Sequence, residues 1–94
     1  MISRDLEFRG INRRHLELYF EELGGKRLGS EAVDSFPILF VGDGWEGHIV
    51  SEKELAFTAV FKVNAVKIRF VAEDEVALTE LLKKYRYKTT RVGG

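Results

Sequence analysis

Residues 42–48, G-D-G-W-E-G-H, hold most of the side chains that could do chemistry in this sequence. Their three glycines match G-x-G-x-x-G, a spacing that cradles a dinucleotide phosphate when a strand precedes it and a helix follows. A strand pattern precedes the glycines, but the residues that follow them, 48–55, H-I-V-S-E-K-E-L, are not typical of a phosphate-binding helix. Asp43 and Glu46 would also place negative charge beside the phosphates. The segment therefore favours a hairpin turn, because Asp43-Gly44 is a preferred turn pair.

Metal and acid–base chemistry are the next candidates. His15 and His48 are the two histidines of the sequence, and Asp43, Glu46 and Glu52 are close to His48 along the chain. No H-x-x-x-H or H-E-x-x-H spacing supports a metal site. The sequence has no cysteine, which excludes disulfides, thiolate nucleophiles and cysteine-bound metals. The sequence also shows no recognisable Ser-His-acid triad. We expect no metal, no cofactor and no catalytic residues.

Binding is the chemistry that the sequence favours instead. Trp45 on a hairpin could be a platform for a ligand or an anchor for a partner, or it could be a core ring whose N–H finds a carbonyl. The candidate residues for binding a ligand or partner are Asp43, Trp45 and His48 at the turn, with Phe57 and Phe61 further along the chain.

The last two residues, Gly93 and Gly94, suggest a different chemistry. Ubiquitin-like sulfur carriers end in Gly-Gly, and their terminal carboxylate is adenylated and converted to a thiocarboxylate. Such a carrier has a β-grasp fold, which begins with a β-hairpin before its helix, whereas this sequence has a single strand there. We therefore expect residues 89–94 to be a flexible tail, with a functional carrier tail as the alternative.

The elements that would position these residues can be predicted from periodicity. Residues 2–9 alternate as a half-buried strand. A helix over 13–23 follows, with Asn12 as its N-cap and Gly24-Gly25 as its stop. Further strands are expected at 26–33, 36–41, 45–51 and 66–70, with a turn at 34–35, an exposed loop at 52–54 and an extended stretch at 55–63. A change of phase predicts a bulge or bend at 64–65.

A second helix is expected after Asp74, which is its predicted cap. The order β-α-β-β-β-β-α predicts an α+β fold in which two helices pack on one face of a single antiparallel sheet, in one domain over residues 1–94. Its core should contain the following residues: Leu6, Phe8, Leu16, Phe20, Leu23, Ile68, Phe70, Leu78, Leu81 and Leu82. The other face of the sheet would stay open. We expect Phe57, Phe61 and Val63 to line it with Trp45 at the rim, as a concave binding face or a homodimer contact.

Charge is distributed unevenly although the net charge is zero. All 15 acidic residues lie at or before Glu80, while five of the 15 basic residues follow it. Cations in the last turns of a helix are stabilised by its dipole, and the acidic body would repel phosphates, so we expect no nucleic-acid partner. No apolar run approaches the roughly 20 residues that span a bilayer. The first residues, M-I-S-R-D-L-E, lack the pattern of a signal peptide. We expect a cytoplasmic protein that does not enter a membrane.

A resemblance to a known family rests on three segments. They are residues 15–29, H-L-E-L-Y-F-E-E-L-G-G-K-R-L-G, residues 66–75, V-K-I-R-F-V-A-E-D-E, and the helix after them. Here the sequence resembles the C-terminal domain of MoaD-related proteins, relatives of the small, sulfur-carrying subunit of molybdopterin synthase. The resemblance implies a TATA-binding-protein-like (TBP-like) β-α-β4-α fold. It also implies a setting in molybdenum or tungsten cofactor synthesis and sulfur transfer. The family's sulfur-carrier domain is absent from this sequence, and Gly93-Gly94 does not correspond to its diglycine, so no active-site residue can be carried over.

The sequence therefore predicts a non-catalytic accessory domain that binds a ligand or a protein. The expected partners are a sulfur carrier, a cofactor-synthesis protein or a second copy of the chain. Two alternatives stay open: a stand-alone sulfur carrier that uses Gly94, and a small ligand-binding protein or enzyme with its site at the 43–48 turn.

Overall fold

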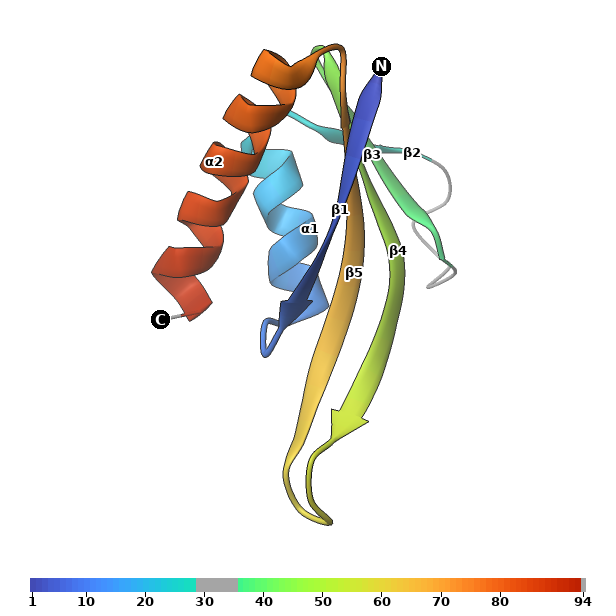
Figure 1. Ribbon diagram of the computed structural model, residues 1–94, viewed down its shortest axis with the longest axis vertical. Helices are drawn as coiled ribbons and strands as arrows, with labels where there is room; N and C mark the ends of the chain where they lie inside the picture. The colour runs from blue at the N-terminus through green and yellow to red at the C-terminus, as the bar shows by residue number, and fades with distance from the viewer. Residues whose placement is uncertain (29–35, 94) are drawn as a thin grey trace.

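The described part of the chain folds into one five-stranded antiparallel sheet with two helices packed on one face (Figure 1). The computed structural model describes residues 1–28 and 36–93, with side chains through residue 90. The strands are β1 (Ile2–Arg9), β2 (Lys26–Leu28), β3 (Ile38–Gly42), β4 (Trp45–Ala56) and β5 (Lys62–Ala72), and the helices are α1 (Arg13–Glu22) and α2 (Glu75–Gly93). The sheet order is β1-β5-β4-β3-β2. The predicted α+β fold is confirmed, and it is compatible with a TBP-like arrangement.

The first helix begins and ends where the sequence predicts. The Asn12 side chain accepts a hydrogen bond from the Arg14 N–H at 2.8 Å, which satisfies one of the free amides at the helix start. At the other end, Gly24 has a φ of 93°, and the Gly25 N–H donates to the Phe20 carbonyl at 2.8 Å. A left-handed residue after the last turn lets the chain reverse direction, so α1 stops and β2 begins at once.

The core lies between the sheet and the helices and is built around Phe20. Its ring stands 4.6 Å from the ring of Tyr85 and 5.3 Å from that of Phe40, centroid to centroid. Gly47 on β4 makes this possible, because a Cβ there would overlap the Phe20 ring. Seven of the ten predicted core residues are buried, and Leu6, Phe8 and Leu23 pack against them partly buried. The prediction omitted these buried members of the core: Tyr19, Ile38, Phe40, Ile49, Val66, Ala72 and Tyr85.

The long β4–β5 hairpin corrects three predictions at once. Residues 52–54 are part of β4 rather than a loop. The stretch 55–63 is not one extended segment, because β4 ends at Ala56 and the chain turns back into β5 at Lys62. The irregularity expected at 64–65 lies instead on the partner strand, where the pairing shifts between Ile49 and Ser51. The extra residue on β4 shifts the register of the pairing, so Ser51 rather than Val50 stands opposite Lys67.

The second helix also differs from its prediction at the C-terminal end. Asp74 caps its start, with its side chain accepting from the Ala77 N–H at 2.8 Å. The helix then runs to Gly93, so residues 89–93 are helical rather than a loose tail. Thr89 is buried and donates to the Arg86 carbonyl, and no residue before Gly93 interrupts the helix. Gly94 lies outside the described residues.

The remaining strands agree with the sequence to within a few residues. β3 begins two residues later than predicted and ends at Gly42. Within the described residues, β2 spans Lys26–Leu28. The rest of the predicted strand 26–33, and the turn predicted at 34–35, lie outside the described residues. Among the described helices, neither is long and apolar enough to cross a membrane.

Candidate functional site

The structure separates the predicted binding residues into three places. Alternation along β4 turns Trp45 and Gly47 toward the helices and turns Glu46 and His48 toward the open face. Phe57 and Phe61 lie at the far end of the β4–β5 hairpin. The turn that holds Asp43 is a two-residue connection between Gly42 and Trp45, and Gly44 adopts a φ of 80° there. The hairpin turn is therefore confirmed, but the five candidates do not form one site.

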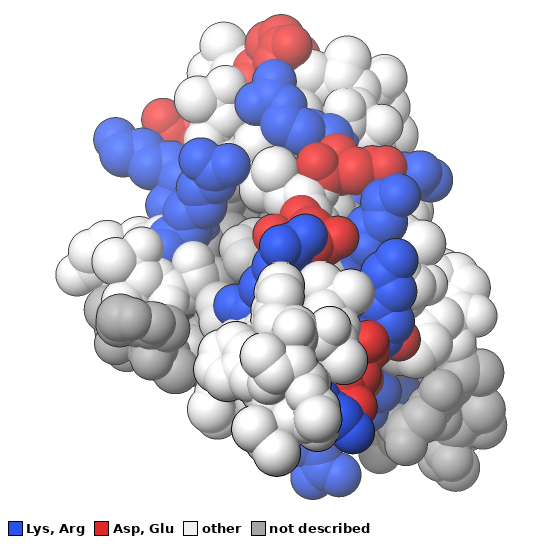
Figure 2. Space-filling model, turned by 60° about the horizontal axis from the view of Figure 1, so that its bottom comes forward, with Lys and Arg blue, Asp and Glu red and all other residues white. Residues whose placement is uncertain are grey.

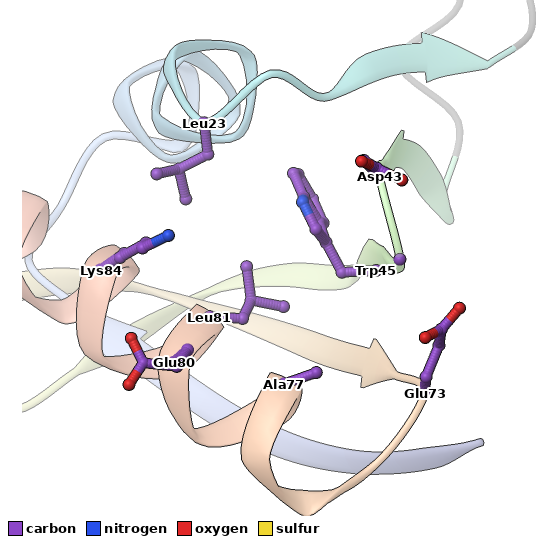
Figure 3. Close-up of a pocket in the computed structure, with 9 residues that line it drawn as sticks. Leu23, Asp43, Trp45, Glu73, Ala77, Glu80, Leu81 and Lys84 are labelled. Atoms are coloured by element: carbon purple, nitrogen blue, oxygen red, sulfur yellow. The ribbon is translucent and has the colours of Figure 1, made fainter.

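The first place is a cleft of about 370 Å³ between the 43–45 turn and one flank of α2 (Figure 3). Trp45 forms one wall and stacks on Phe20 at 5.7 Å. Its ring covers Gly42 and Gly25, where any Cβ would collide with it. Trp45 is thus both a partly buried core ring and a cleft wall, rather than the rim of the open face. The floor is apolar, and the charged groups around it are Asp43, Glu73, Glu80 and Lys84.

The second place, the open face of the sheet, is charged rather than apolar. Across β1 and β5, Arg69 donates to both carboxylate oxygens of Asp5, at 2.9 and 3.2 Å. The hydrogen bond from Arg69 lowers the pKa of Asp5, and the one from Arg9 lowers the pKa of Glu7. His48 lies on the same face as Asp5. This corrects the prediction of an apolar concave face.

His48 contacts Glu46 rather than a cluster of ligands. The His48 Nε2 atom lies 2.8 Å from a carboxylate oxygen of Glu46, and both side chains are partly exposed. Across the ladder, His48 stands opposite Leu39 and Arg69. Within the part of the chain that the structure describes, no group of three or more His, Asp or Glu side chains could hold a metal ion.

An ion-pair network on the helix side of the sheet was not predicted. Arg13 contacts Glu17 at 3.0 Å and Glu52 at 3.3 Å, and Arg27 contacts the other oxygen of Glu17 at 3.0 Å. The i, i+4 spacing of Arg13 and Glu17 was a usable signal. The contacts to β2 and β4 were not visible, because Glu52 was expected in a loop. These mostly buried side chains tie α1 to both strands.

The third place is the tip of the β4–β5 hairpin, residues 57–61. Beyond Lys53 and Ala65, no other described strand pairs with β4 or β5, so the hairpin extends past the rest of the sheet (Figure 1). Phe57 is 56% exposed, Phe61 is 57% exposed and Val60 is 93% exposed. The two phenyl rings contact each other, with centroids 5.8 Å apart. Figure 2, which brings this end forward, shows an uncharged protrusion surrounded by charged side chains.

Hydrogen bonds close the turn at the hairpin tip. The Phe57 N–H donates to the Phe61 carbonyl at 2.9 Å. The Thr58 hydroxyl accepts from the Phe61 N–H at 2.9 Å and from the Val60 N–H at 3.3 Å. Such a side-chain-to-backbone turn shapes the backbone between the two phenylalanines. The tip therefore presents its apolar side chains in a preformed arrangement.

The fold and these surfaces define a small α+β domain with an exposed apolar hairpin and a shallow cleft. A family model for the archaeal MoaD-like protein matches residues 4–94. The chain therefore belongs to the archaeal MoaD-like protein family, which confirms the resemblance to MoaD-related proteins. A comparison with curated proteins finds no significant match.

Proposed function

We propose that this chain is a non-catalytic accessory domain that binds a protein in molybdenum- or tungsten-cofactor synthesis and sulfur transfer. The observation that carries the proposal is the exposed aromatic pair, Phe57 and Phe61, on a hairpin that extends beyond the sheet. Membership of the MoaD-like family supports the metabolic setting. The partner that fits this setting is a sulfur-carrier protein or another protein of cofactor synthesis.

Exposed apolar side chains at the hairpin tip favour association for a physical reason. Burying apolar surface contributes about 25 cal/mol per Å², so two phenylalanines and a valine can dominate a small interface. Aromatic side chains are common among the residues that carry most of the binding energy. A tip that is already ordered loses little conformational entropy on binding. The hairpin therefore has the composition of a protein contact.

The test is isothermal titration calorimetry with the sulfur-carrier protein and the cofactor-synthesis proteins of the same organism. The double variant Phe57→Ser, Phe61→Ser should bind at least about tenfold more weakly than the natural chain, because it loses the aromatic anchors. The matched control is Val76→Ser, which removes an apolar side chain that is 73% exposed on α2. Equal binding by the natural chain and the double variant, or no binding of any of these proteins, would contradict the proposal.

The stand-alone sulfur carrier is the second candidate, and membership of the MoaD-like family favours it. The fold does not, because a β-grasp carrier opens with a β-hairpin, whereas here α1 follows β1 directly. The discriminating measurement is intact mass after incubation with ATP, an activating enzyme and a sulfur donor. Replacing an oxygen of the Gly94 carboxylate by sulfur adds about 16 Da. We expect no such shift, and a shift that requires Gly94 would replace our proposal with the carrier.

A small-ligand site is the other alternative, and the cleft beside Trp45 favours it. Trp45 is the one tryptophan of the sequence, so its fluorescence reports directly on the cleft. A saturable change in Trp45 fluorescence on titration with a small cofactor precursor would support a ligand site in the cleft. This holds provided that Leu81→Ala or Lys84→Gln in the cleft wall alters the change in fluorescence. Without such a change, the hairpin proposal stands.

A further inference from the structure

A second groove runs between the edge strand β1 and the outer flank of α2, away from the hairpin tip. It measures about 430 Å³ and is lined by Arg4 on β1 and by Thr79, Leu82, Lys83 and Arg86 on α2. The four helical residues follow i, i+3, i+4 and i+7, so they form one stripe along α2. Leu82 is buried and makes the apolar floor. We call this surface the basic groove.

The charge of the basic groove is positive and mostly uncompensated. Three of its five residues are cations. Arg4 lies 3.9 Å from Glu75, but both side chains are at least half exposed, and an exposed pair at that distance is weak. Neither Lys83 nor Arg86 has an acidic partner among the residues that the structure describes. The groove is therefore suited to an anionic ligand.

The edge strand β1 beside the groove can contribute backbone hydrogen bonds to a bound peptide. Among the strands that the structure describes, β1 stands first in the sheet order and pairs only with β5 over its eight residues. An edge strand presents a row of N–H and C=O groups on its outer side, and an extended peptide can pair with them as an additional strand. Alternate side chains of such a peptide would point to the helix side of the sheet, where Arg4, Lys83 and Arg86 stand.

We propose that β1 and the basic groove together bind an extended acidic peptide segment of a partner protein. The segment pairs with β1 as a sixth strand and places carboxylates, two residues apart, against Arg4, Lys83 and Arg86. A polyphosphate chain fits less well, because it has no N–H groups to pair with the edge of β1. On the other face of β1, Asp5 and Glu7 are already paired with Arg69 and Arg9, so neutral residues suit the intervening positions of the peptide. This inference does not depend on the hairpin contact or on the metabolic setting.

The test is fluorescence anisotropy of a labelled, end-capped octapeptide of alternating Glu and Thr, titrated with the full chain at low salt. Its length matches the eight residues of β1. The variant Lys83→Gln, Arg86→Gln should bind at least about tenfold more weakly, because it loses two charge-assisted contacts. The matched control Lys67→Gln, Lys84→Gln removes the same charge from the open face and the cleft flank of α2 and should bind within about twofold of the natural chain.

Two further peptides test the two parts of the proposal. A Gln-Thr octapeptide tests the charge, and a Glu-Thr octapeptide with N-methyl groups on alternate residues tests the strand pairing. Each should bind at least about tenfold more weakly than the parent peptide. Equal binding of either modified peptide, equal loss in the control variant, or tighter binding of an eight-nucleotide single-stranded DNA would overturn the proposal.

Discussion

At the scale of single residues, Tyr85 connects the two helices. Its hydroxyl donates to the Leu16 carbonyl of α1 at 2.7 Å, and its side chain is fully buried. Tyr85→Phe removes the hydroxyl donor, so the buried Leu16 carbonyl loses one hydrogen-bond partner. We therefore expect this substitution to lower the free energy of unfolding by about 1 kcal/mol. The matched control is Tyr87→Phe on the same helix, where the side chain is 67% exposed. Urea denaturation that shows no difference between the two variants would contradict this role of Tyr85.

The same hydroxyl makes stability depend on alkaline pH. Burial raises the pKa of Tyr85 well above its ordinary value. A tyrosine whose pKa is raised in the folded state contributes stability that is fully present below its unfolded pKa and is lost as pH rises through the folded pKa. We therefore expect the free energy of unfolding to fall above about pH 10.

The comparison that isolates this contribution is between the natural chain and Tyr85→Phe across pH 8 to 11. The difference in the free energy of unfolding between them should shrink as pH rises, because the lysines titrate equally in both proteins. A difference that stays constant over this range would show that Tyr85 does not titrate during unfolding.

At the scale of elements, α2 depends on one apolar stripe for its place on the sheet. Leu81 is nearly completely buried between α2 and the core. Leu81→Ala should lower the free energy of unfolding by about 2–5 kcal/mol, because it removes buried methyl groups and leaves a cavity. Val76→Ala on the exposed side of α2 should change it by less than about 0.5 kcal/mol. A loss below that value for Leu81→Ala, measured by urea denaturation, would reject this packing of α2.

The elements also show where prediction from sequence works and where it fails. Asn12, Gly24 and Asp74 mark helix ends through local backbone chemistry, so these boundaries were predictable. The bulge on β4 could not be predicted. The change in the hydrophobic pattern is visible on β5, whereas the extra residue lies on β4, the strand that pairs with β5. The hairpin turn at 57–61 was missed since its tip contains neither Gly nor Pro and is built by the Thr58 hydroxyl.

At the scale of the whole molecule, the candidate site was predicted less well than the fold. Sequence distance placed His48 beside Trp45, but strand alternation puts the two side chains on opposite faces of the sheet. Phe57 and Phe61 are predicted from the sequence as binding residues, yet their position at a hairpin tip depends on where β1 and β3 end. Such information is contained in strand lengths and register, which periodicity does not determine.

Self-association is a further prediction at this scale. An exposed apolar tip can bind a second copy of the same tip as readily as a partner. We expect sedimentation equilibrium to show a homodimer whose dissociation constant rises at least about tenfold in Phe57→Ser, Phe61→Ser. A strictly monomeric natural chain would contradict the predicted homodimer but not the proposed contact with another protein. Dimerisation that the double variant leaves unchanged would place the interface elsewhere.

The central claim is that the hairpin tip is the contact for a partner protein. Hydrogen–deuterium exchange of the full chain, alone and with the sulfur-carrier protein of the same organism, tests it most directly, because the amides report on position as well as on binding. We expect exchange to slow at residues 57–61 in the complex, and the slowing to be absent in Phe57→Ser, Phe61→Ser. A complex that protects other segments and leaves residues 57–61 unchanged would contradict it.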